Sequence, residues 1–453
     1  MLFSSLPFLY FFLPVTVALY FALPPRWRNG LLLAASLFFY AWGEPKYLLL
    51  MLFSICAFYA CGLAIARSER KKAWLILAVG LGVGQLAIFK YADFFLATVS
   101  GLTGAQLPLL HLALPIGISF YTFQCISYAV DVYRGTVPAQ RSLVNFGAYV
   151  CLFPQLIAGP IVRYADIAGA LDERKTDWAD FATGLRRFLV GLGKKVFLAN
   201  QFGELTQLFR DSGEKSVLFY WLYALGFTLQ IYYDFSGYSD MAIGLGRVLG
   251  FRFPENFDYP YCSASITDFW RRWHKSLGSW FRDYVYIPLG GNRVPTGLWV
   301  RNILTVWLLT GLWHGASWNF VLWGGAFGLI LLLEKWVPRL KQLPGALGHG
   351  YVLLIVTFSF VLFNASSLAQ AGQDFAGLLG LAGLPAVSTA SLYYLRSYAA
   401  LFAVGGLGAT PLPAKWAARL PGWAEPILTC GLLLLCTAYL VDGSFNPFLY
   451  FRF

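Results

Sequence analysis

The sequence predicts an all-α polytopic membrane protein, and three observations support this prediction. Hydrophobic residues make up 58% of the 453 residues, and 45 glycines raise the apolar share to about two-thirds, against about half in soluble domains. Charged residues make up only 12%, about half the usual share. Apolar runs close to the length of about 20 residues that crosses a membrane recur along the chain. These features exclude a soluble globular domain, a disordered chain, a coiled coil and a disulfide scaffold.

The first half of the chain divides into four apolar runs separated by short polar segments. Basic residues cluster at 26–28 and at 67–72, after the first and third runs, whereas the other connections carry almost none. Because basic loops stay in the cytoplasm, the N-terminus is predicted to lie outside, in the periplasm of a bacterium. The apolar start lacks a charged leader, which favours a retained span over a cleaved signal. The expected spans are residues 2–23, 31–42, 47–66 and 73–98.

The middle of the chain is less regular. Residues 112–130 are apolar but contain Pro115 and Gly117, which predicts a broken or re-entrant segment buried within the protein. Residues 144–161 form another apolar stretch, and residues 163–180 are predicted to be a cytoplasmic loop. Further spans are expected at residues 188–200, 217–233, 303–312, 318–333, 351–369, 393–407 and 426–441.

No repeat or linker divides the chain, so we expect one membrane-embedded domain over residues 1–453. Its motif-rich core covers about residues 112–335, and its C-terminal spans cover about residues 350–441. Basic residues outnumber acidic ones by 34 to 22, which in such a protein indicates loop charge and no nucleic-acid partner. The seven cysteines show no zinc-binding spacing, so no metal site is expected.

Residues 251–301 mix aromatic and charged side chains densely. The steps from Trp270 to Trp273 and from Trp280 to Tyr284 are helical offsets, which predicts an amphipathic helix at the membrane interface. Much of the scarce charge lies in residues 234–301, in the half of the chain that also holds two of the four histidines. This concentration favours a reaction chamber within the bilayer.

Histidine is the side chain whose ordinary pKa lies near neutral pH, and two of the four are candidates for chemistry. His314 lies in a nearly charge-free apolar stretch, where ionisable groups are usually functional, and its flanking glycines allow close approach of a chain or substrate. His274 adjoins three cations, which would keep its imidazole neutral. Packing remains the alternative for His314, and a solvated cationic face for His274. His111 and His349 fit loop or interfacial positions.

A polar cluster follows the expected span at residues 217–233. Its carboxylates would pair with Arg271 or Arg272, or orient a histidine; a polar helix end or a structural salt bridge is an equal alternative. Paired acids alone do not define acid–base chemistry, and no phosphate-binding or metalloprotease motif accompanies them. The members of this cluster are Asp234, Ser236, Tyr238 and Asp240.

Seven motifs in order along the chain carry a specific resemblance. They are residues 114–121 (LPIGISFY), 131–135 (DVYRG), 153–160 (FPQLIAGP), 233–240 (YDFSGYSD), 269–274 (FWRRWH), 288–293 (PLGGNR) and 312–315 (LWHG). Together they resemble the membrane-bound O-acyltransferase (MBOAT) family, in its alginate O-acetyltransferase (AlgI-like) branch. After about residue 351 the similarity is limited to hydrophobic character.

The resemblance implies an O-acetyltransferase with a ring of about 10–12 transmembrane helices and re-entrant segments around a central funnel or tunnel. It implies that His314 is catalytic and that His274 lies nearby across the site. No metal and no bound cofactor are expected. The residues expected to line the cavity are Asp234, Ser236, Tyr238, Asp240, Trp270, Arg271, Arg272, Trp273, Trp313 and Asn319.

The implied donor is acetyl-CoA or another cytoplasmic acyl thioester, whose phosphates basic residues near the inner mouth would hold. His314 would act as general base on an acceptor hydroxyl, a contribution of about 10²–10⁴-fold, and His274 would hold or polarise the donor carbonyl or the acceptor. The acetyl group would cross the bacterial inner membrane to an exported polysaccharide such as alginate. A periplasmic SGNH-type acetyltransferase and an export complex would be partners, with membrane lipid around the protein.

Three alternatives stay open. The first keeps the enzyme class but changes the acceptor to cellulose, another glycan, or teichoic acid that receives D-alanine. The second is a transporter or channel that uses His314 and the acidic cluster, although inverted repeats, common in transporters, are not visible in the sequence. The third is a structural scaffold of an export complex, against which the aromatic-rich motifs argue.

Overall fold

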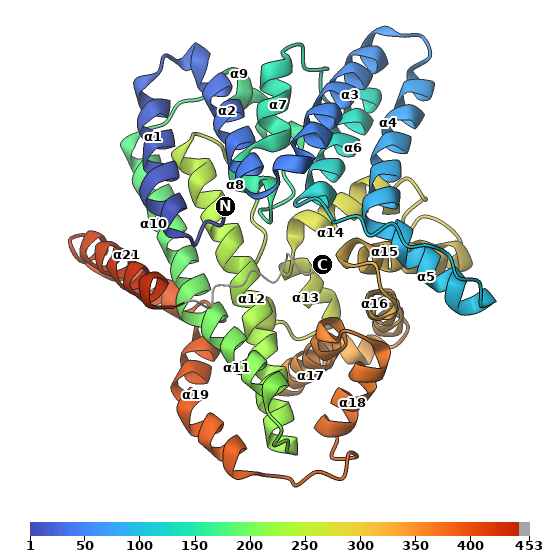
Figure 1. Ribbon diagram of the computed structural model, residues 1–453, viewed down its shortest axis with the longest axis vertical. Coiled ribbons are helices and arrows are strands. Elements are labelled where there is room, and N and C mark those ends of the chain that lie inside the picture. The colour runs from blue at the N-terminus through green and yellow to red at the C-terminus, as the bar shows by residue number, and fades with distance from the viewer. Residues whose placement is uncertain (444–453) are drawn as a thin grey trace. The chain divides into compact units, whose positions relative to one another are not determined.

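The computed structural model describes residues 1–443, and all regular structure in that part is helical (Figure 1). This confirms the all-α prediction for those residues. The chain separates into two compact units: unit 1 comprises Met1–Phe188 and Tyr238–Glu255, and unit 2 comprises Leu189–Gly237 and Asn256–Phe453. One membrane domain stays a prediction, and its last residues, 444–453, lie outside the described part.

Unit 1 contains a group of helices that pack side by side. Helices α2, α3, α4, α6 and α7 contact one another in this group (Figure 1). α10 (Trp178–Gly193) leads from unit 1 into unit 2, and α12 (Val217–Val248) leads back. The remaining elements are η1 (Phe8–Phe12), α1 (Leu13–Ala22), α2 (Pro25–Gly43), η2 (Pro45–Tyr47), α3 (Leu48–Arg67), α4 (Lys71–Leu86), η3 (Ala87–Tyr91), α5 (Ala92–Thr103), α6 (Ile118–Arg134), α7 (Leu143–Cys151), α8 (Phe153–Leu156) and α9 (Tyr164–Asp172).

The predicted interruption before residue 130 is confirmed. Residues 104–117 contain no helix, and α6 begins directly after Gly117, whose φ is +74°. A Cβ on this residue would lie 2.7 Å from the carbonyl oxygen of Leu156, so both the backbone conformation and the close approach require glycine. Most residues of α6 are buried, as an interrupted segment within a membrane protein requires.

Two predictions about polar stretches are wrong. Residues 163–180 are not a continuous loop, because α9 forms there; Asp166 in its first turn accepts a hydrogen bond from the Arg163 N–H at 2.9 Å. The predicted interfacial helix is instead two short helices, α13 (Ile266–Arg272) and α14 (Lys275–Phe281). Their tryptophans are partly or fully buried, so the helical offsets serve packing within the protein.

Unit 2 is centred on the hairpin of α15 and α16. α16 also contacts α13 and α17, and α17 contacts α18 (Figure 1). The further elements of this unit are η4 (Lys194–Ala199), α11 (Asn200–Asp211), η5 (Pro260–Cys262), η6 (Arg282–Tyr286), α15 (Thr296–His314), α16 (Trp318–Trp336), η7 (Pro338–Gln342), α17 (Gly345–Asn364), α18 (Leu368–Leu378), α19 (Thr389–Gly408), α20 (Leu412–Ala417) and α21 (Ala424–Asp442).

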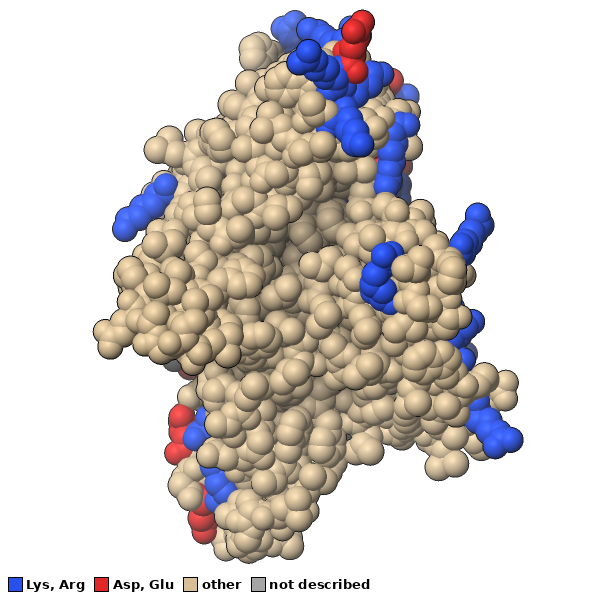
Figure 2. All heavy atoms as spheres, turned by 90° about the vertical axis from the view of Figure 1, so that its right-hand side faces the viewer, with Lys and Arg blue, Asp and Glu red and all other residues tan. Residues whose placement is uncertain are grey.

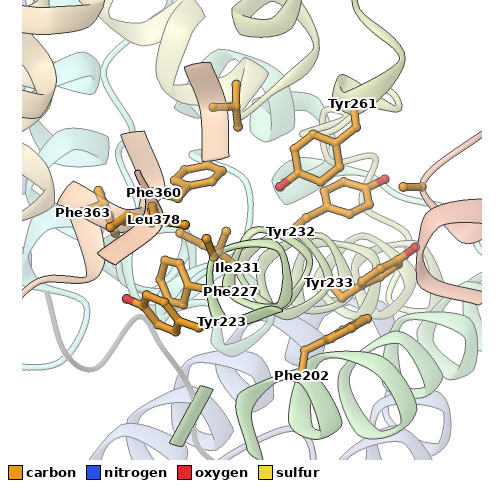
Figure 3. Close-up of a cluster of buried hydrophobic side chains, with 14 of the residues drawn as sticks. Phe202, Tyr223, Phe227, Ile231, Tyr232, Tyr233, Tyr261, Phe360, Phe363 and Leu378 are labelled. Carbon is orange, nitrogen blue, oxygen red and sulfur yellow. The ribbon is translucent and has the colours of Figure 1, made fainter. Parts of the chain in front are cut away.

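The core of unit 2 is aromatic and surrounds α12. Figure 3 shows Tyr223, Phe227, Tyr232 and Tyr233 projecting from α12 in different directions, each toward side chains of other elements. Burial of each large apolar side chain contributes about 1.5–3 kcal/mol, and aromatic pairs add about 0.5–1.5 kcal/mol. This packing anchors α12, which carries all four residues of the polar cluster.

Four helices of the described residues are long and apolar enough to cross a membrane. They are Pro45–Arg67, Lys71–Thr103, Gly345–Asn364 and Ala424–Asp442, with Phe8–Ala22 as a shorter apolar helix. The other expected spans within residues 1–443 are helical but do not meet this criterion of length, hydropathy and charge. The ring of about 10–12 spans around a funnel therefore stays a prediction.

Positive charge gathers at one end of the α3–α4 hairpin in unit 1. Arg67, Arg70, Lys71 and Lys72 are all exposed there, and Figure 2 shows Lys and Arg side chains concentrated at this end of the hairpin. The sequence pattern and the structure therefore agree on a basic end of unit 1.

Candidate active site

His274 lies on the turn between α13 and α14 in a left-handed backbone conformation, with φ +46° and ψ +52°. This conformation is uncommon for a residue with a Cβ and costs about 1–3 kcal/mol. Two backbone hydrogen bonds flank the turn and offset this cost. The Asp258 N–H donates to the Arg272 carbonyl at 2.9 Å, and the Lys275 N–H donates to the Asn256 carbonyl at 2.9 Å.

The imidazole of His274 is buried, with 2% of the residue exposed. Its Nδ1 lies 3.0 Å from Oδ1 of Asn256, and its ring lies edge-on to Phe235 with 4.7 Å between centroids. His274 lies outside the candidate spans, and burial lowers its pKa and keeps the ring neutral. We predicted from the sequence that neighbouring cations would keep the imidazole neutral. Its burial is the cause instead.

His314 ends α15 and lies among aromatic rings, with 8% of the residue exposed. Its imidazole centroid lies 4.8 Å from Trp313, 5.1 Å from Trp323 and 5.2 Å from Phe363. The ring of Trp313 also lies 5.5 Å from that of His274. The structure therefore brings the two candidate histidines together around one indole.

The glycines near His314 permit close packing between α15 and α16. A Cβ on Gly311 would lie 2.3 Å from the Phe320 carbonyl oxygen, and one on Gly315 would lie 2.2 Å from the Phe320 ring. Such distances are too short for any side chain. The expectation of a close approach is confirmed, and the approaching chain is the protein's own α16.

A cavity of about 200 Å³ adjoins His274. Two of the residues predicted to line a cavity, Trp270 and Trp273, line it together with His274. Sequence reasoning did not single out the other lining residues. Four of them, on α15, recur at steps of three and four residues from the first, so the sequence places them on one helix face: Ile303, Val306, Trp307 and Thr310. The additional lining residues are Leu277, Gly278, Phe281, Arg282, Tyr286, Ile303, Val306, Trp307 and Thr310.

Asp234 forms a buried ion pair with a residue that the sequence did not suggest. The Nζ of Lys195, in the π-helical segment η4, lies 2.6 Å from its Oδ1, and both side chains are 3% exposed. Pairing with Arg271 or Arg272 is thereby excluded. Ser236, two residues further along α12, is also buried, and its hydroxyl has no hydrogen-bond partner among residues 1–443. Neither residue lines the cavity beside His274.

Tyr238 and Asp240 belong to unit 1 and have structural contacts there. The Tyr238 ring stacks on Phe3 at 4.5 Å between centroids. Asp240 accepts hydrogen bonds from Arg187, with its Oδ1 2.9 Å from Nη2, and Arg187 also binds Glu255. Asp240 and Glu255 therefore have an ion-pair partner within unit 1.

The remaining predicted residues do not line the cavity beside His274. Arg271 is exposed, and Arg272 forms an ion pair with Asp268 at 2.9 Å. Asn319 is buried, and its Nδ2 donates to the Ala365 carbonyl at 2.6 Å. The amide therefore ties the start of α16 to the connection between α17 and α18.

Glu334 positions α13 and was missed by sequence reasoning. This residue of α16 is fully buried and accepts hydrogen bonds from the N–H groups of Ile266 and Thr267 at 2.7 and 2.9 Å. The Thr267 hydroxyl donates to the same carboxylate at 2.5 Å. A carboxylate at a helix N-terminus satisfies donors that lack helical partners. In the sequence, Glu334 is a single acidic residue at the end of an apolar run, and this position could have indicated a structural or functional role.

An all-α chain with membrane-spanning helices and two buried histidines around one indole defines a helical membrane protein with a candidate site for proton transfer. Comparison with known sequences makes this specific. A sequence model described as MBOAT, the membrane-bound O-acyltransferase family, matches residues 138–368. The chain belongs to this family and is an O-acyltransferase of the membrane.

Several relatives share substantial identity over most of this chain. A probable alginate O-acetylase AlgI of Azotobacter vinelandii is 38% identical over 100% of both chains. The corresponding protein of Pseudomonas aeruginosa is 45% identical over 82% of this chain and 73% of its own length. A peptidoglycan O-acetyltransferase of Helicobacter pylori is 35% identical over 85% of this chain and 81% of its own. The predicted resemblance is confirmed.

Proposed function

We propose that this enzyme transfers an acetyl group from cytoplasmic acetyl-CoA across the bacterial inner membrane, for O-acetylation of an exported polysaccharide such as alginate. The observation that carries the proposal is the pair of buried histidines around Trp313, of which His274 also lines an apolar cavity. Two relatives named probable alginate O-acetylase, matched over 100% and 82% of this chain, support the choice of acceptor. Family membership favours this over a transporter or a scaffold.

His314 acts as the general base in this proposal. It takes the proton of an acceptor hydroxyl while the oxygen attacks the thioester carbonyl. The new C–O bond forms, the C–S bond breaks, and the departing thiolate receives the proton. No bound cofactor takes part. Positioned proton transfer of this kind contributes about 10²–10⁴-fold to the rate.

The cavity beside His274 suits the acyl end of the donor. Its lining is mainly aromatic and aliphatic, with Thr310 and Arg282 as polar members. Exclusion of water from such a space limits hydrolysis of the thioester. The acetyl group then passes to the polysaccharide through a periplasmic SGNH-type acetyltransferase within an export complex.

The orientation follows from the basic end of unit 1. The turn with Arg67 and Lys71 lies in the cytoplasm, because positive loops are retained there. The first turn of α2, with Arg26 and Arg28, lies on the same side in this proposal, and the N-terminus is then in the periplasm. Labelling of single cysteines introduced at Lys72 and near Met1, with a membrane-impermeant reagent on intact cells, tests this orientation.

The acceptor is tested in cells. A strain that lacks the enzyme should produce polysaccharide without acetyl esters, and wild-type protein but not His314→Ala should restore them at equal abundance in the membrane. Loss of acetyl esters from peptidoglycan instead would favour the acceptor named for the Helicobacter pylori relative. Restoration by His314→Ala would contradict the role of His314.

A further inference from the structure

The side-chain amide of Asn256 has an orientation fixed by its neighbours. Its Oδ1 lies 3.3 Å from the backbone N–H of Ser276 and 2.9 Å from the Ser276 hydroxyl. A backbone N–H only donates, so the atom that faces it is the amide oxygen and not the amide nitrogen. Asn256 is fully buried, so water does not compete for this oxygen.

The same oxygen decides which nitrogen of His274 carries the proton. Nδ1 of His274 lies 3.0 Å from Asn256 Oδ1, and an acceptor oxygen requires a donor opposite it. The proton of the neutral imidazole is therefore on Nδ1. Nε2 then carries a lone pair, and it is buried without a hydrogen-bond partner in the described part of the chain.

The imidazole is held from several directions. Backbone hydrogen bonds on both sides of His274 fix its left-handed turn to the segment that begins at Asn256. Phe235 contacts the ring edge-on, and Trp313 lies 5.5 Å away. A buried acceptor without a partner costs about 1–3 kcal/mol, so a position that retains one points to a donor supplied by substrate.

We propose that Asn256 is a positioning residue that holds His274 in the Nδ1–H tautomer, so that Nε2 accepts a hydrogen bond from a donor group of the acyl acceptor next to the attacking hydroxyl. This inference rests on the proposed function and refines it. In this tautomer Nε2 cannot donate, so His274 does not polarise the thioester carbonyl. His274 orients the acceptor through that group, and His314 removes the proton of the attacking hydroxyl.

The tautomer is measured directly by ¹⁵N NMR of the full-length protein labelled at histidine. The signals of His274 are identified as those absent from His274→Asn, since asparagine tolerates the left-handed backbone. The expected spectrum shows a protonated Nδ1 and an unprotonated Nε2. A proton on Nε2, or on both nitrogens, at neutral pH would overturn the proposal without reference to any activity.

Kinetics test whether the tautomer matters for the reaction. Asn256→Leu removes the acceptor and should lower kcat by at least about tenfold with little change in the KM for acetyl-CoA. Asn256→Asp keeps an acceptor oxygen and should restore both the Nδ1–H signal and most of kcat. Ser279→Ala is the matched control and should behave as wild type. Ser279 lies on α14, as Ser276 does, but its hydroxyl donates to the Ser276 carbonyl and does not contact Asn256.

The outcomes separate the two proposals. Loss of kcat in folded Asn256→Leu with rescue by Asn256→Asp supports the positioning role. Wild-type kcat in folded Asn256→Leu contradicts the positioning role. If Asn256→Leu does not fold, Asn256→Asp decides: loss of the Nδ1–H signal in that variant contradicts the positioning role. Failure of the proposed function gives a different result: His314→Ala would be fully active, and the tautomer of His274 would be unchanged.

Discussion

The imidazole of His274 lies 5.5 Å from the ring of Trp313, the residue that directly precedes His314. A turn between two short helices and the last residue of α15 therefore meet at one indole. Their relative position depends on contacts that hold α13 and the α15–α16 hairpin, because these elements carry the two histidines. Substitutions at those contacts should change activity without touching either imidazole.

Glu334 is such a contact. Glu334→Ala removes the carboxylate that accepts from the N–H groups of Ile266 and Thr267, and it leaves buried donors unsatisfied at a cost of about 1–3 kcal/mol. We expect a lower melting temperature in detergent and a lower kcat, because α13 shifts with the turn that holds His274. Lys335→Ala, at the exposed neighbouring position, should change neither. Equal stability of both variants would show that the carboxylate does not hold α13.

Two adjacent glycines on α16 test the close packing of the hairpin. A Cβ on Gly324 would lie 2.3 Å from the Trp307 carbonyl oxygen, whereas one on Gly325 would lie 3.6 Å from the nearest atom, of Leu308. Gly324→Ala should destabilise the protein by about 1–3 kcal/mol, and Gly325→Ala should be neutral or slightly stabilising. Thermal unfolding of the purified variants measures the difference. The packing account is wrong if the two variants unfold at the same temperature.

The buried pair of Lys195 and Asp234 should show strong coupling. Lys195→Met alone leaves a buried carboxylate without its counter-charge and should cost about 3–5 kcal/mol. Lys195→Met combined with Asp234→Leu removes both charges and should recover most of that loss. A double-mutant cycle of unfolding midpoints measures this coupling. Additive effects of the two substitutions would mean that the ion pair contributes no net interaction.

The burial of His274 predicts a specific pH dependence of stability. Its pKa in the folded protein lies below the ordinary value of 6.5, so below that pH the unfolded chain binds a proton that the folded chain does not. Stability is therefore lost as pH falls, by about 1 kcal/mol between about pH 7.5 and about pH 5.5 from this residue. His274→Asn lacks this titration and should lose less stability over the same range. Parallel losses in both proteins would place the titration elsewhere.

The sequence predicted the two histidines and the aromatic cavity wall better than it predicted the charged groups. His274, His314, Trp270 and Trp273 stand in dense motifs, and composition makes such residues conspicuous in an apolar chain. The partner of Asp234 was not predictable, because Lys195 lies on another helix and the contact depends on tertiary packing.

The periodicity of the sequence also could not predict that the helix is interrupted at His274. Helical offsets of three and four residues fit one interfacial helix and two short packed helices equally well, and only the backbone shows the left-handed residue between them. Asn256 has no distinguishing neighbourhood in the sequence, and its role follows from a turn that pairs it with His274. Composition was therefore enough to predict the all-α fold class, whereas the arrangement of the site depends on tertiary contacts.

The central claim is that His314 catalyses acyl transfer from a thioester, and the most direct test is a rate measurement on purified protein. Wild type, His314→Ala and the control His349→Ala are assayed for release of free CoA from acetyl-CoA with a polysaccharide or partner acceptor present. His349 suits the control because its Nδ1 donates to the Ser263 carbonyl at 3.0 Å as a structural bond. The account predicts that His314→Ala lowers the rate by about 10²–10⁴-fold and that His349→Ala stays near wild type. A wild-type rate in folded His314→Ala would contradict it.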